Sequence, residues 1–237
     1  MLAGTDNVAE AKVAYSQAIV ILDELKSQAD LRATVQSNLA GMLARDKPAV
    51  ALELARESLT QQLTRLEADS GDPELATQVI VTLNTLAKAQ SESSDHKAAA
   101  QTLRQAVEIG RQVNARWPEQ LPYRRDLVVS LNSLGTSLSE LKRLDQAGIV
   151  LEQAAKHGRY LDTKLPNSAE IQSMLGGVLN NLGFVRHQQG DEANALQCYG
   201  EAVDRQQAAA RLAPDVPRYR QLLETHQFNL DRLEGDS

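Results

Sequence analysis

The amino-acid sequence predicts an all-α fold, a right-handed α-solenoid of antiparallel helical hairpins with a period of about 48 residues. Three observations predict it. A leucine-rich phrase returns at a constant interval, at 83–87, 131–135 and 179–183. Apolar residues around each copy recur at three- and four-residue spacing, which is the period of one helix face. Only 3% of the residues are aromatic, which favours a core of close alanine and leucine contacts between helices.

Other positions of the repeat keep the same register. An alanine follows each leucine-rich phrase, a second small residue comes seven positions later, and a proline follows the second helix of each unit. Recurrence at a fixed period is the signature of stacked repeats, in which each unit buries its apolar face against its neighbours. The first alanines are Ala99, Ala147 and Ala195, the second small residues are Ala106, Ala154 and Ala202, and the prolines are Pro118, Pro166 and Pro214.

Taken in order, the predicted elements fill the chain from 1 to 237 as one solenoid. The first is a half repeat, because Ala11, Tyr15 and Ala18 repeat the pattern of a second helix alone. The last is a single helix that matches the first half of a unit. The full set is a half repeat at 5–27, hairpins at 29–68, 73–114, 120–163 and 168–212, and a terminal helix at 216–233.

Helix starts are marked by side chains that cap free backbone N–H groups. Asp46 before Pro48, Asp72 before Pro73 and Asp191 after Gly190 are predicted N-caps, since Asp accepts a hydrogen bond there and proline is tolerated in the first turn.

The residues Leu182-Gly183, Ala195, Tyr199 and Ala202 resemble the tetratricopeptide repeat (TPR), which has a Leu-Gly pair in its first helix and an Ala-aromatic-Ala series in its second. The usual TPR period is about 34 residues, so both helices are expected to be longer here by about two turns. The long period is similar to the kinesin-light-chain type. The stretch 123–127 is similar to arrays attached to bacterial regulatory Ser/Thr kinases, although no kinase motif occurs in this chain.

The resemblance implies a non-catalytic scaffold that binds a protein or peptide in a concave groove lined by the first helices. It would be a regulatory or signalling module of a larger protein. The alternative is a structural spacer or oligomerisation element without a groove ligand, and the sequence leaves both open. Self-association through the N-terminal helix is a further possibility, because that helix has a wide apolar stripe.

Asparagine recurs at one register of the predicted groove although it disfavours the interior of a helix. Its amide both donates and accepts hydrogen bonds, so a row of amides could hold a peptide main chain; in the family that this chain resembles, this asparagine contacts peptide backbones. The alternatives are that the amides bind a neighbouring helix or face solvent. With residues at i+4 and i+7 on the same face, the predicted groove residues are Asn84, Lys88, Asn132, Thr136, Asn180, Phe184 and His187.

The sequence predicts no enzyme, cofactor or metal site. Its four histidines fall in different hairpins, and no spacing justifies a catalytic group. Cys198 is the only cysteine and is expected to be a buried, unreactive thiol. The net charge of −6 argues against nucleic-acid binding. No apolar run approaches the roughly 18 residues of a membrane span, and no export signal is visible, so we expect a cytoplasmic protein without a membrane partner.

Overall fold

The structure, a computed structural model, describes residues 13, 16–17, 20–21 and 29–235. Within these residues it contains nine long α-helices and no strand. The predicted half repeat at 5–27 and its proposed role in self-association lie almost wholly outside the described residues. Contacts within the chain group it into two compact units, residues 1–117 and 118–237, which are described separately. The prediction of one continuous solenoid domain stays a prediction.

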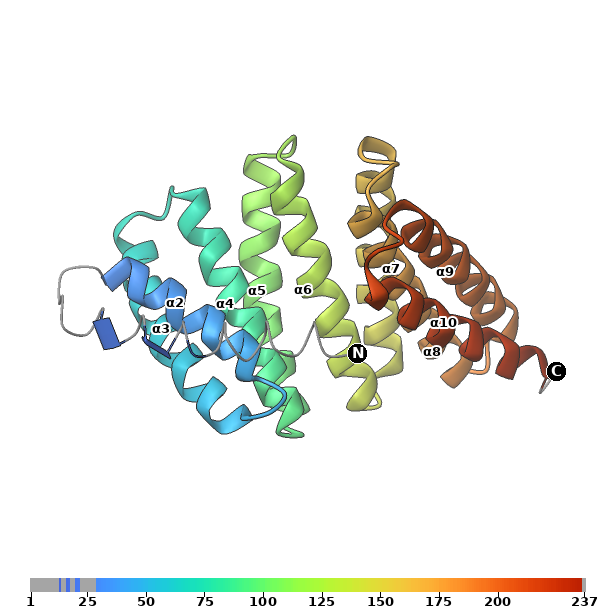
Figure 1. The fold of residues 1–237 in the computed structure, drawn as a ribbon, viewed down its shortest axis with the longest axis horizontal. Coiled ribbons are helices and arrows are strands. Elements are labelled where there is room, and N and C mark those ends of the chain that lie inside the picture. The colour runs from blue at the N-terminus through green and yellow to red at the C-terminus, as the bar shows by residue number, and fades with distance from the viewer. Residues whose placement is uncertain (1–12, 14–15, 18–19, 22–28, 236–237) are drawn as a thin grey trace. The chain divides into compact units, whose positions relative to one another are not determined.

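The first unit consists of two helical hairpins. Helix α2 (Ala29–Leu43) pairs with α3 (Pro48–Ala68), and α4 (Pro73–Glu92) pairs with α5 (His96–Arg116). The hairpins stack through α3 against α4, and the two first helices, α2 and α4, also touch (Figure 1).

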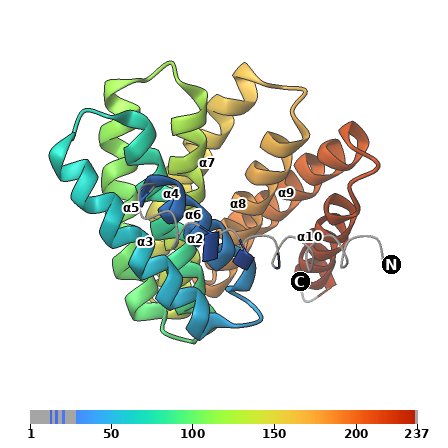
Figure 2. The same cartoon turned by 60° about the vertical axis from the view of Figure 1, so that its left-hand side comes forward.

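The second unit continues the same pattern with two hairpins and a single helix. Helix α6 (Leu121–Glu140) pairs with α7 (Leu144–Lys164), and α8 (Ala169–Gln188) pairs with α9 (Glu192–Leu212). Helix α10 (Pro217–Gly235) packs on α9 and touches α8 (Figure 2). The first helices of this unit, α6, α8 and α10, are therefore neighbours in one layer.

The periodic small residues allow the two helices of each hairpin in the second unit to touch. A Cβ added at Gly183 would lie 2.9 Å from the ring of Tyr199, and one added at Gly135 would lie 2.5 Å from Leu151. Ala147, Ala154, Ala195 and Ala202 are fully buried. Close packing between helices needs small residues on one side of the contact. The all-α array of hairpins predicted from the sequence is thus confirmed.

The turns within three hairpins share one backbone conformation. Ser94, Lys142 and Gly190 have φ of 62°, 60° and 79°, and each is followed by an N–H that donates to a carbonyl five residues earlier at 2.9 Å. This is a helix ending of the Schellman type, which requires a left-handed residue at this point. Only Gly190 adopts that conformation without steric cost.

Two of the three predicted N-caps are confirmed. The Asp72 carboxylate accepts a hydrogen bond from the N–H of Leu75 at 3.0 Å, and that of Asp191 from the N–H of Asn194 at 3.4 Å. The prediction for Asp46 is wrong. Because α3 begins at Pro48, its N-cap position falls on Lys47 and not on Asp46, and no side-chain hydrogen bond caps the helix among the described residues.

Candidate functional site

The first helices of the second unit enclose an open groove of about 690 Å³. This volume lies within the range of about 300–1,000 Å³ typical of ligand sites. Its lining residues belong to α6, α8 and α10 and to the segment just before α10. It is lined by Arg125, Asp126, Val129, Asn132, Ser133, Glu170, Ser173, Met174, Gly177, Val216, Arg218, Tyr219 and Leu222.

Apolar side chains form part of the lining of this groove. Val129 on α6 is 41% exposed and Val216, just before α10, is 40% exposed. Met174 and Leu222 also line the groove and are half-buried. The absence of a side chain at Gly177, where an added Cβ would meet nothing within 4 Å, keeps the floor of the groove open.

Charged side chains also line the groove. The Arg125 guanidinium lies 3.2 Å from the Glu170 carboxylate, which links α6 to α8, and 3.5 Å from the carboxylate of Asp126. On the wall formed by α10, the exposed Arg218 makes no ion pair with any residue that the structure describes. The groove therefore combines the Arg218 guanidinium on α10 with a cluster on α6 and α8 in which two carboxylates share the single guanidinium of Arg125.

Asp126 is the most deeply placed of these charges, with only 8% of its surface exposed. Burial raises the pKa of its carboxyl group, and the neighbouring Arg125 partly offsets this effect by stabilising the charged form. A buried carboxylate with a single long contact is an incompletely satisfied acceptor, and it lies on the surface of the groove.

The recurring asparagines form amide pairs between first helices. The side-chain N–H of Asn181 donates to Oδ1 of Asn132 at 2.9 Å, and that of Asn229 donates to Oδ1 of Asn180 at 2.8 Å. Each pair joins a first helix to the next one in the layer. The Nδ2 groups of Asn132 and Asn180 have no acceptor among the described residues, so both amides keep donors for a further partner.

The other predicted groove residues lie outside this groove. The Thr136 hydroxyl donates to the main-chain oxygen of Asn132 at 3.1 Å and accepts from Asn181 at 3.4 Å. Phe184 is 38% exposed on α8, and Nδ1 of His187 is buried and has no hydrogen-bond partner among the described residues. Asn84 and Lys88 belong to α4 in the first unit, half-buried and exposed respectively. Of the seven predicted residues, Asn132 alone lines the groove of the second unit.

The groove residues predicted from the sequence do not include those one and two turns before Asn132. Positions 125 and 129 share a helix face with Asn132 because they lie seven and three residues before it. The predicted rows began at the asparagine and extended only toward the carboxyl end of each helix. Reading the same face in the other direction would have found Arg125 and Val129, although their distance from Arg218 depends on the packing of α10.

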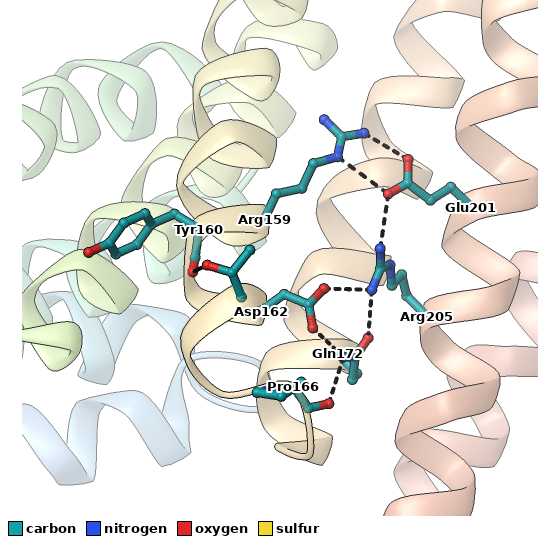
Figure 3. A network of polar contacts seen from close by, with 8 residues as sticks. Arg159, Tyr160, Asp162, Pro166, Gln172, Glu201 and Arg205 are labelled. Atoms are coloured by element: carbon teal, nitrogen blue, oxygen red, sulfur yellow. Dashed lines mark hydrogen bonds and ion pairs between the residues drawn. The ribbon is translucent and has the colours of Figure 1, made fainter.

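A polar network connects α7, α8 and α9 (Figure 3). Arg205 on α9 lies 2.7 Å from the Asp162 carboxylate on α7 and donates to Oε1 of Gln172 on α8 at 3.3 Å. Gln172 in turn donates to Asp162 at 2.5 Å. Arg159 forms two hydrogen bonds with Glu201, at 3.3 and 2.7 Å. These contacts connect α7, α8 and α9, and they hold α8 in place as the central wall of the groove.

The described residues do not form a metal site or a reactive cysteine site outside the groove. Among the described residues, no three His, Cys, Asp or Glu side chains lie together as metal ligands would. Cys198 is half-buried, and burial raises the pKa of its thiol, which favours the less nucleophilic protonated form. Within the part of the chain that the structure describes, no helix is long and apolar enough to cross a membrane.

Comparison with known proteins finds a tetratricopeptide-repeat match in one segment of the chain and the same fold in solved structures. Residues 177–208, which cover most of the α8–α9 hairpin, match the family model described as tetratricopeptide repeat. A search of curated protein sequences finds no match to the chain.

Solved structures share the fold at low sequence identity. BtubC (BKLC) from P. vanneervenii is 17% identical, with a TM-score of 0.61 and coverage of 99% of this chain and 94% of its own. A Rap protein complexed with competence and sporulation factor is 12% identical, with a TM-score of 0.61, covering 98% and 72%. A Podosopora anserina protein of nearly identical TPR-like repeats, named after kinesin light chain, is 17% identical, with a TM-score of 0.56, covering 87% and 97%.

Proposed function

The chain is a TPR-like array of helical hairpins, and we propose that it is a non-catalytic scaffold that binds a peptide segment of a partner protein in the groove of the second unit. The groove itself is the observation that carries this proposal. It combines exposed apolar side chains, an amide donor at Asn132 and an available guanidinium at Arg218. Apolar walls with a few convergent polar groups are typical of binding sites.

The chemistry of the groove suggests how a peptide would lie. Val129, Met174 and Leu222 would contact apolar side chains, while the Asn132 amide would donate to a main-chain carbonyl. Arg218 would pair with a carboxylate of the peptide, since a guanidinium fits a carboxylate with two parallel hydrogen bonds. The Rap protein of the same fold was crystallised with competence and sporulation factor, which gives the proposal a structural precedent only.

A regulatory or signalling role within a larger cytoplasmic protein is part of this proposal. It is supported by the resemblance of 123–127 to arrays attached to bacterial regulatory kinases. Self-association through the predicted helix at 5–27 would be a separate property of the chain, and light scattering at several concentrations would detect it.

The proposal is tested by selecting peptides from a displayed library against the full chain and measuring their affinity by fluorescence anisotropy. Asn132→Ala should weaken the selected peptides about 2- to 10-fold, the effect of losing one hydrogen bond, and Arg218→Ala should weaken those with a carboxylate. Asn167→Ala is the matched control, because Asn167 is an exposed loop amide outside the groove. If Asn132→Ala and Arg218→Ala bind the selected peptides as tightly as the control Asn167→Ala, or if no peptide is selected, the groove is not the binding site. Either result would favour the alternative function of a structural spacer.

A further inference from the structure

By its register, helix α10 is the first helix of a hairpin. In the same unit, α7 packs on one face of α6 and α9 packs on the same face of α8. No described helix packs on the corresponding face of α10. The consequence is visible at one register: Leu127 and Leu175 are buried, whereas Leu223, 48 residues further on, is half-buried. Five residues later, Phe228 is 64% exposed.

This face of α10 borders a hollow of about 460 Å³ that also reaches α9. We call it the α10 seat, defined by Val203, Leu223, Glu224, Gln227, Phe228 and Asp231. Leu223, Phe228 and Val203 supply apolar surface, and the other three side chains are polar. By its register, the seat occupies the place where a second helix would complete the hairpin of α10.

The seat differs from its interior counterparts at the point of closest approach. Gly135 and Gly183 accept the side chains of Leu151 and Tyr199, leaving no room for a Cβ. The third residue of this register is Asp231. A helix bearing a bulky side chain at that point therefore cannot dock as α9 docks on α8, and a docking helix would meet a carboxylate instead.

The charges of the seat are acidic. Glu224 stands at the register of Gly176, which in the interior hairpin faces the Cβ of Arg205. Asp231 accepts a hydrogen bond from Gln227 at 2.7 Å. Neither Glu224 nor Asp231 has a cationic partner among the described residues, so the seat presents two available carboxylates beside exposed apolar surface.

We propose that the α10 seat binds an amphipathic helix of a partner protein, with an apolar ridge against Leu223 and Phe228 and basic side chains paired with Glu224 and Asp231. An amphipathic helix laid in an apolar groove is a common mode of recognition. The predicted helix at 5–27 of a second copy is a poorer occupant on two grounds. It has four acidic residues against two lysines, and it would bring Tyr15 to the position of Asp231.

The test uses the full chain and labelled peptides with the sequence of Glu192–Leu212, the helix that fills the equivalent place on α8. The basic peptide carries Tyr199→Lys, which removes the bulky ring and offers a cation to Asp231, and it keeps Arg205 opposite Glu224. The acidic control carries Tyr199→Glu and Arg205→Glu. We expect saturable binding of the basic peptide in fluorescence anisotropy, weakened by added salt, and weaker binding of the acidic control.

Variants of the chain distinguish the seat from non-specific attraction. Glu224→Lys with Asp231→Lys should weaken the basic peptide about 2- to 30-fold, since two exposed ion pairs are lost, and should strengthen the acidic one. Phe228→Ala, an exposed position, should weaken both peptides, while Asn167→Ala should change neither. Absence of saturable binding by the basic peptide, equal affinity for both peptides, or concentration-dependent dimerisation of the chain that Phe228→Ala abolishes would overturn the proposal.

Discussion

The contact between Gly183 and Tyr199 predicts that a single methyl group will strain the α8–α9 hairpin. In Gly183→Ala, the new Cβ would lie 2.9, 3.0 and 3.1 Å from three atoms of the Tyr199 ring. Carbon atoms in favourable contact are about 3.5–4.0 Å apart, so the ring would have to move by roughly 0.5–1 Å. Tyr199 is buried, with only 1% of its surface exposed, which leaves it little space to do so.

The magnitude follows from two opposing terms. Overpacking of this kind costs about 1–3 kcal/mol, whereas replacing a helical glycine by alanine gains about 1 kcal/mol of helix propensity. The expected free energy of unfolding therefore falls by about 0–2 kcal/mol. Gly200→Ala on α9 is the matched control, because nothing lies within 4 Å of its added Cβ and only the propensity term applies.

The assay is urea unfolding of both variants followed by circular dichroism at 25 °C. The free energy of unfolding of Gly183→Ala should be lower than that of Gly200→Ala by about 1–3 kcal/mol, and this difference is the cost of overpacking alone. A Gly183→Ala protein that is stabilised as much as the Gly200→Ala protein would refute the reasoning, since it would mean that the ring yields without cost.

Three further predictions concern the turns, the terminal helix and the polar network. Lys142→Gly should raise the free energy of unfolding by about 1 kcal/mol, because glycine adopts the φ of 60° without the steric cost of a side chain, and thermal melting would reveal the gain. Burial lowers the pKa of His226 in the folded protein, so below the unfolded pKa of about 6.5 the unfolded chain binds more protons than the folded one. The free energy of unfolding should therefore fall as the pH drops from about 6.5 toward the folded pKa. Denaturation at several pH values should show this dependence in the unmodified chain and not in His226→Gln. Arg205→Ala removes the contacts to Asp162, Gln172 and Glu201 and should cost about 1 kcal/mol in urea unfolding, whereas Arg211→Ala, an exposed control, should be nearly neutral.

Much of the fold could be predicted because the residues at the helix contacts recur at fixed positions in each repeat. Leu131, Gly135 and Ala147 mark the contact surfaces of a hairpin wherever it lies in the chain. Asp72 and Asp191 cap helices through bonds to residues three positions away, which the sequence brings together by itself. The cap predicted at Asp46 failed for a local reason too, since the turn before Pro48 places Lys47 at the cap position.

The groove was predicted less completely, because its residues come from three separate helices. The register located Asn132 and left open whether its amide binds a neighbouring helix, but it did not identify Asn181 as the partner of its amide oxygen. The sequence by itself therefore determined the helices, their pairing into hairpins and the small residues at their contacts, since these depend on periodicity and short-range bonds. Only the tertiary structure decided that Arg125, Glu170 and Arg218 share one groove and that α10 leaves Phe228 exposed, because these features depend on which helices lie side by side.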